Sequence, residues 1–253
     1  MSTHLYPPSR PQSIGEVLDT TFKLLGVSLL RTLPYSILMT LAGQLGNIDN
    51  LLAGRNARIF VPRDPATWLL WAVSVISSLL LWAALLRRQR AIAQGEPVST
   101  RAELATALHL LPSLVLLFIL LFVAVLCGTL LLIVPGIYLA VALSMAMPAM
   151  VLAGKSPIDA LKYSLALVRR QWWRVLGIIL VTAVIIVAFY ILAIIVTVIV
   201  VRFARGADVA LVTAATTVLV IALGAFANPC FSAMVLAIFG DLEARRVPIA
   251  ASP

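Results

Sequence analysis

The chain has 253 residues, of which 62% are hydrophobic and only 11% are charged, and its formal net charge is +9. An ordinary soluble domain carries about 25% charged residues. The composition excludes a water-soluble globular domain, and several apolar runs reach the roughly 20 residues with which a helix crosses a hydrocarbon core. We therefore predict an all-α, polytopic integral membrane protein that forms one domain over residues 1–253.

Six apolar runs are the predicted membrane spans, at residues 27–47, 67–86, 112–133, 136–153, 175–201 and 209–239. Val134-Pro135-Gly136 separates the third run from the fourth, and we expect a tight hairpin there, because Pro cannot continue a helix and Gly accepts a reversed backbone. In the sixth run, Asn228 and Pro229 mark a predicted kink or break, because Pro229 removes a backbone donor. Asn228 can then satisfy a freed backbone group.

Three polar segments share a helix-start pattern, in which a hydroxyl residue stands three positions before an acid. They are Ser13-Ile14-Gly15-Glu16, Thr100-Arg101-Ala102-Glu103 and Ser156-Pro157-Ile158-Asp159. Such a pair caps the first turn of a helix, and Pro157 takes the favoured first helical position. The pattern predicts three copies of an amphipathic interfacial helix followed by two spans, in units 13–98, 99–155 and 156–241, with a cytoplasmic tail at 242–253.

The basic residues are divided unequally between the two sides of this topology. One side holds fourteen Lys and Arg residues, and the other holds five, namely Arg55, Arg58, Arg63, Arg202 and Arg205. Positively charged loops stay on the cytoplasmic side of a membrane. We therefore expect both termini in the cytoplasm.

The polar segment before the fifth span concentrates Arg169, Arg170 and Arg174 around Trp172 and Trp173. An indole combines a large apolar body with one polar donor and suits the membrane interface. Basic residues near the surface attract anionic headgroups by about 1 kcal/mol each. These five residues are therefore the candidate contact with membrane lipid, preferentially anionic, or with a partner protein. Anchoring of the third unit is the competing interpretation.

Residues 130–180 carry a resemblance through the PGIYL turn, the SPIDAL helix start and the RQWWRVLG return to the membrane. They resemble the membrane domain of glycerophosphoryl diester phosphodiesterases and related stand-alone bacterial membrane proteins. SIGEVLDTTFKLL and FGDLEARR look like the ends of the same family. The resemblance implies a six-helix domain in a bacterial inner membrane. The family's catalytic residues belong to a soluble barrel that we do not find in this sequence, so none is carried over.

The titratable residues form no catalytic or metal-binding pattern. Metal-assisted hydrolysis needs several ligands and a general acid or base held together, whereas the ten acids are dispersed outside the predicted spans. His4 and His109 are not paired with acids, and Cys127 and Cys230 are interpreted as packing residues. We expect no catalytic residue, no metal, no cofactor and no nucleic-acid partner.

The favoured function is a non-enzymatic membrane protein that acts in membrane or envelope homeostasis by binding lipid or a partner protein. Two alternatives remain open. One is a transporter or lipid-translocating protein with a pathway near Asn228 and Pro229, since an interrupted helix is typical of transporters. The other is a membrane-embedded glycerophospholipid enzyme, against which the dispersed acids argue.

Overall fold

A computed structural model describes residues 6–45, 65–203 and 209–246 of the chain. Every regular element in these ranges is a helix: α1 (Ile14–Gln44), α3 (Pro65–Gln94), α4 (Thr100–Leu131), α5 (Ile133–Ala142), α6 (Ala146–Ala153), α7 (Pro157–Val168), the 3-10 helix η2 (Arg169–Gln171), α8 (Trp172–Phe203) and α9 (Val209–Arg246). Six candidate membrane spans are found within the described ranges. The predicted all-α polytopic membrane fold is confirmed. His4, Arg55, Arg58, Arg63 and Arg205 lie outside the described residues.

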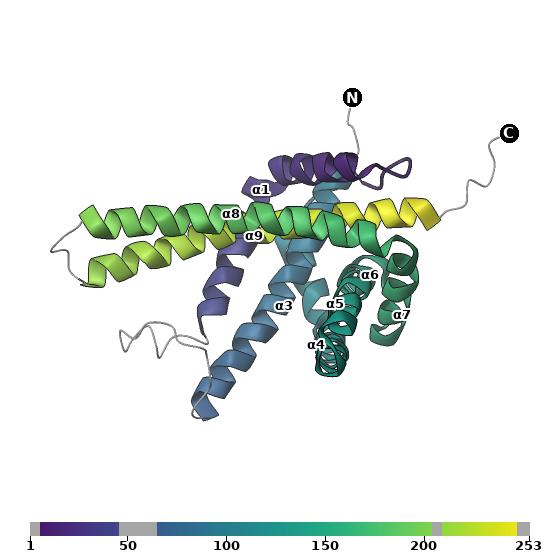
Figure 1. Cartoon of the computed structure of the whole chain (residues 1–253), viewed down its shortest axis with the longest axis horizontal. Coiled ribbons are helices and arrows are strands. Elements are labelled where there is room, and N and C mark those ends of the chain that lie inside the picture. Colours follow the sequence, from purple (N-terminus) through teal and green to yellow (C-terminus); the bar gives the residue numbers. More distant parts are fainter. Residues whose placement is uncertain (1–5, 46–64, 204–208, 247–253) are drawn as a thin grey trace.

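The carboxyl-terminal half of α9 is the centre of the molecule. Residues 232–242 are all buried, and α9 contacts α1, α3 and α8. Apart from Asp241, these positions are apolar or small, so this part of the helix has no polar face and requires neighbours on all sides. Figure 1 shows α1, α3 and α8 gathered around it.

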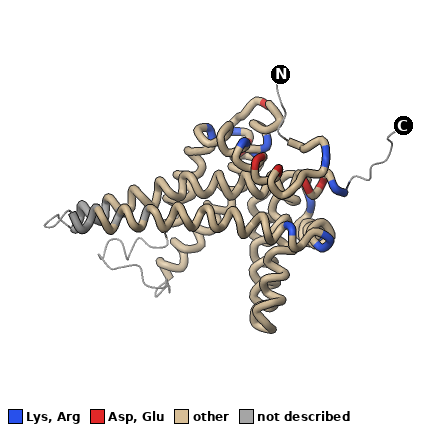
Figure 2. The backbone as a smooth tube through the Cα atoms, turned by 45° about the horizontal axis from the view of Figure 1, so that its top comes forward, with Lys and Arg blue, Asp and Glu red and all other residues tan. Residues whose placement is uncertain are grey.

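Two helical hairpins, α8 with α9 and α4 with α5, project from this centre in different directions (Figure 1). The tip of the α4–α5 hairpin exposes a run of large apolar side chains, Leu130, Leu131, Leu132, Ile133 and Val134. Figure 2 shows the charged residues gathered where the hairpins join the rest of the molecule, whereas the projecting parts are almost uncharged. Apolar surface of this extent fits contact with lipid.

The turn between α4 and α5 lies earlier in the chain than the sequence predicts. Leu132 alone, in an extended conformation, separates the two helices. Pro135 fits the first turn of α5 because amide groups there have no helical partner. Gly136 does not reverse the backbone but permits close approach, since a Cβ on it would lie 2.8 Å from the Cα of Thr129.

The fourth span consists of two helices, because α5 ends at Ala142 and α6 begins at Ala146. Pro148 lies in the first turn of α6. Because it has no N–H, it cannot donate the hydrogen bond to the residue four positions earlier that would join α6 to α5 as one helix. The buried hydroxyl of Ser164 on α7 bridges the break: it donates to the carbonyl of Ala142 at 2.8 Å and accepts from the N–H of Met145 at 3.1 Å. The break therefore also fixes the position of α7.

Of the three predicted interfacial helices, the third is a separate helix, whereas the first and second continue without interruption into spans as α1 and α4. The predicted caps at Ser13 and Ser156 are confirmed. The cap of α4 is Ser99 instead of Thr100. Thr100 accepts a hydrogen bond from Arg88, and Glu103 binds the same guanidinium, so both residues are used in tertiary contacts.

No break occurs at Asn228 and Pro229, because α9 is continuous from Val209 to Arg246. Of the predicted kink or break, the break is wrong and the kink stays a prediction, and the helix also extends into the predicted tail. Contacts from neighbouring helices hold this region: Asn228 donates to the hydroxyl of Thr40 on α1 at 3.3 Å, and the carbonyl of Pro229 accepts from Gln89 on α3 at 2.9 Å. These hydrogen bonds tie this part of α9 to α1 and α3.

We expect Gly136→Ala to lower the free energy of unfolding by about 1–3 kcal/mol, because the new methyl group overpacks the α4–α5 contact against backbone atoms. Gly26→Ala is the matched control, since a Cβ there meets nothing within 4 Å and Ala favours the helix. Unfolding in mixed micelles of increasing dodecyl sulfate content measures both. Equal stability of the two variants would contradict close packing at Gly136.

Candidate functional site

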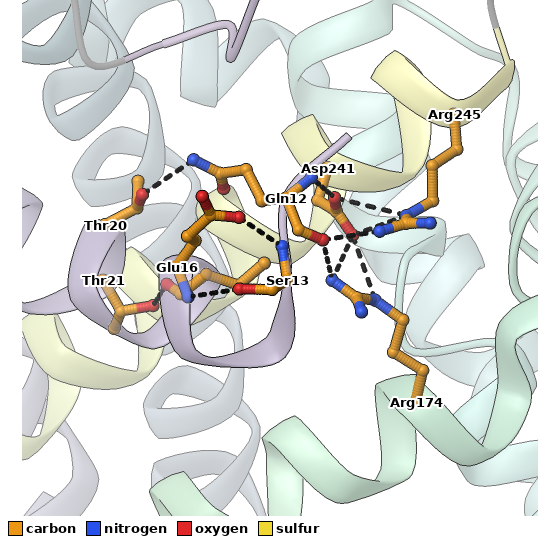
Figure 3. Close-up of polar contacts among 9 residues, drawn as sticks. Gln12, Ser13, Glu16, Thr20, Thr21, Arg174, Asp241 and Arg245 are labelled. Atoms are coloured by element: carbon orange, nitrogen blue, oxygen red, sulfur yellow. Dashed lines mark hydrogen bonds and ion pairs between the residues drawn. The ribbon is translucent and has the colours of Figure 1, made fainter. Parts of the chain in front are cut away.

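Asp241 on α9 accepts hydrogen bonds from three separate parts of the chain (Figure 3). Arg174 on α8 donates to its Oδ2 atom from Nε and Nη2, at 3.2 and 3.1 Å, and Arg245 donates from Nε to both carboxylate oxygens, at 3.3 and 3.1 Å. The N–H of Gln12 donates to Oδ1 at 2.7 Å, while the carbonyl of Gln12 accepts from both guanidinium groups. We call this group of four residues the Asp241 clasp.

The charge pairing in the Asp241 clasp has a structural role. The side chain of Asp241 is only 2% exposed, and a buried carboxylate is tolerated only when it is paired and hydrogen-bonded. Arg174 and Arg245 are partly exposed and share this one carboxylate, so one positive charge is left over at the surface. The clasp ties the segment before α1 to the start of α8 and the end of α9.

The segment before α1 also packs against α9 through Tyr6. A Cβ on Gly240 would lie 2.8 Å from the ring of Tyr6, so only glycine permits this approach. Burial, together with the nearby Glu243 carboxylate, raises the pKa of the Tyr6 hydroxyl above its ordinary value. Tyr6 therefore stays neutral, which suits its buried position.

A second buried ion pair joins α1, α3 and α4. Nε of Arg88 lies 2.9 Å from Oε2 of Glu103, and each side chain is 9% exposed. The hydroxyl of Tyr35 donates to the same carboxylate oxygen at 2.7 Å, and the guanidinium of Arg88 lies over the Tyr35 ring. Further donors of Arg88 reach the carbonyl of Arg31 and the hydroxyl of Thr100. All three helices must be in place for Oε2 of Glu103 to gain these partners, whereas its buried Oε1 has no hydrogen-bond partner in the described part of the chain.

Sequence reasoning missed both buried carboxylates. Glu103 was assigned to a helix cap, and its partner Arg88 lies in another helix, so no local pattern connects the two. Asp241 has one local signal, because Arg245 follows four residues later on the same helix, where side chains are neighbours. Its other partners, Arg174 and Gln12, are distant in sequence and are found only from the fold.

All five residues named from the sequence line one cavity of about 670 Å³, together with Val134, Ile137 and Tyr138 of α5. We call it the arginine–tryptophan groove; its lining is Val134, Ile137, Tyr138 and residues 169–174.

The aromatic residues of the groove have a defined geometry. Trp172 stacks on Tyr138 with ring centroids 5.7 Å apart, and its Nε1 donates to the Tyr138 carbonyl at 3.2 Å. Trp173 meets Trp172 edge to face at 4.7 Å and remains 79% exposed. A fixed indole thus forms one wall of the groove, and an exposed indole extends from its edge.

The arginines of the groove differ in how they are engaged. Arg174 belongs to the Asp241 clasp, so most of its donors are occupied. Arg169 and Arg170 are exposed, and neither guanidinium group has an ion pair or a hydrogen bond with any part of the chain that the structure describes. The groove therefore combines an apolar and aromatic wall with two guanidinium groups that are available to a ligand.

Two further cavities of the described residues bear on the candidate site. One, of about 360 Å³, is formed by α3, α4 and the loop between them, and Arg87 and Arg90 at its edge donate to carbonyls at the end of α6. The other, of about 420 Å³, lies between α7, η2 and the end of α9. Neither Asn228 nor Pro229 lines any of the three cavities.

His109 and Cys127 are exposed, Cys230 is buried, and within the described ranges no three metal-ligating side chains come together.

A family described as a domain of unknown function, DUF7847, matches residues 58–242, which is well over half of the chain. The chain belongs to this family. The matched range includes the whole arginine–tryptophan groove and Asp241. Comparison with curated proteins and with solved structures gave no match in either case.

We expect Asp241→Asn to lower the free energy of unfolding by about 2–3 kcal/mol, because it leaves two partly buried guanidinium groups without a carboxylate. Asp19→Asn is the control, since Asp19 pairs with Lys23 on the surface of α1 and should contribute only about 0.5 kcal/mol. Chemical unfolding in detergent measures both variants. A loss no larger at Asp241 than at Asp19 would show that the clasp does not hold the helices together.

Proposed function

We propose that this protein is a non-enzymatic integral membrane protein that binds anionic phospholipid in the arginine–tryptophan groove. We place it in a bacterial inner membrane with both termini in the cytoplasm, where lipid binding serves membrane or envelope homeostasis. The observation that carries the proposal is the cavity in which unpaired Arg169 and Arg170 stand beside an apolar and aromatic wall.

The two kinds of lining match the two parts of a phospholipid. A guanidinium group binds phosphate oxygens through two parallel hydrogen bonds, and Arg169 and Arg170 have their donors available. Val134 belongs to the apolar tip of the α4–α5 hairpin and Ile137 is exposed beside it, so an acyl chain that leaves the headgroup meets apolar surface. One molecule can satisfy both parts of the groove.

The groove is formed before a ligand arrives. Stacking and the hydrogen bond to Tyr138 hold Trp172 against α5, so the aromatic wall need not be ordered on binding. Anchoring alone accounts for the exposed Trp173. It gives no reason for a cavity that α5, Trp172 and two arginines without side-chain partners line together, and this favours ligand binding over anchoring.

We expect the double variant Arg169→Gln and Arg170→Gln to weaken phosphatidylglycerol binding roughly 30-fold, from about 1 kcal/mol per basic residue. Native mass spectrometry of the gently extracted full-length protein, titrated with phosphatidylglycerol, measures the affinity. The matched control is Arg101→Gln with Lys162→Gln, which removes two exposed charges that do not line the groove.

Wild-type affinity in the groove variant would refute the proposal. An equal loss in the groove variant and in the control would also refute it, because general attraction to positive charge would then explain binding. Phosphatidylethanolamine, which carries no net charge, tests the requirement for an anionic headgroup and should bind the wild-type protein more weakly than phosphatidylglycerol.

A further inference from the structure

Arg170 lines two cavities at once. On one side it belongs to the arginine–tryptophan groove, and on the other it lines the cavity of about 420 Å³ between α7, η2 and the end of α9. We call this second space the carboxyl-terminal arginine cavity. Its lining consists of Ala166, Leu167, Arg170, Gln171, Leu242, Arg245 and Arg246.

The carboxyl-terminal arginine cavity is strongly basic. Three of its lining residues are arginines and none is acidic. Arg245 shares the Asp241 carboxylate with Arg174, so that carboxylate neutralises only one of the two charges. Arg246 lies with its guanidinium 4.7 Å over the ring of Tyr163, whose hydroxyl donates to the carboxylate of Glu243, a residue that does not line the cavity. The cavity therefore attracts an anion.

We infer that the groove and the carboxyl-terminal arginine cavity bind the two phosphates of one lipid, a phospholipid in which two phosphodiester groups are joined by a short bridge. This inference rests on the proposed function and specifies its ligand. A lipid with a single phosphate occupies one side of Arg170 only. A lipid with two phosphates reaches both sides, and basic pockets between membrane helices suit such headgroups.

Joining the two phosphates in one molecule strengthens binding. Once the first phosphate is held in the groove, the second meets the cavity at a high effective concentration. The apolar wall of the groove, at Val134 and Ile137, selects a lipid over a soluble diphosphate, which has no group to place there. The ligand class is thus set by two basic sites, one shared arginine and one apolar wall.

Arg246→Gln tests the inference, because Arg246 lines the cavity but belongs neither to the groove nor to the Asp241 clasp. Native mass spectrometry of the full-length protein compares cardiolipin, as the two-phosphate lipid, with phosphatidylglycerol. We expect Arg246→Gln to weaken cardiolipin binding about five-fold and to leave phosphatidylglycerol binding unchanged. Arg169→Gln should weaken both lipids by a similar factor, Arg101→Gln neither, and Arg246→Lys should retain cardiolipin.

The outcomes separate the two proposals. Unchanged cardiolipin binding in Arg246→Gln overturns the two-phosphate inference, while a loss of phosphatidylglycerol in Arg169→Gln still supports the proposed function. No effect of Arg169→Gln on either lipid overturns both. Equal weakening of both lipids by Arg246→Gln also overturns the inference, since it indicates a general charge effect. If pyrophosphate competes with cardiolipin at equal concentration, the ligand is a soluble diphosphate and the lipid assignment is wrong.

Discussion

A carboxylate buried among apolar helices must be paired, and this constraint determines how the helices are arranged. Asp241 gains its partners only when the segment before α1, the start of α8 and the end of α9 meet, and Glu103 gains Arg88 and Tyr35 only when α1, α3 and α4 meet. Apolar contacts among membrane helices are weakly directional, because lipid offers similar contacts. The two carboxylates therefore supply specificity, since α1 contributes to the Glu103 site and the segment leading into α1 contributes to the Asp241 clasp.

The same constraint divides the arginines into two groups. Arg88, Arg174 and Arg245 are committed to carboxylates or carbonyls within the protein, and their guanidinium donors are largely used. Arg169 and Arg170 follow α7 directly and have no such partner in the described part of the chain. One short segment, residues 169–174, thus contains both a structural arginine and available ones. This division is the physical basis for a ligand site beside the Asp241 clasp.

Features that depend on neighbouring residues were predicted from the sequence. The six apolar runs, the caps at Ser13 and Ser156 and the gathering of arginine and tryptophan around the start of α8 all follow from composition and short spacing. The predictions at proline were less successful. Pro135 lies inside the first turn of α5, and Pro229 lies within a continuous α9. A proline removes one donor, but whether the helix ends there depends on what neighbouring helices provide.

The sequence by itself determined that this chain is a six-span helical membrane protein and that Arg169, Arg170, Trp172, Trp173 and Arg174 belong to one polar segment. Only the tertiary structure decided that Arg174 is bound by Asp241, that Glu103 pairs with Arg88, and that α5 and α9 supply the other walls of the cavities. Hydropathy and capping act over a few residues, so they can be recognised locally. Pairing of a buried charge depends on which helices meet, and that is settled only when the whole chain has folded.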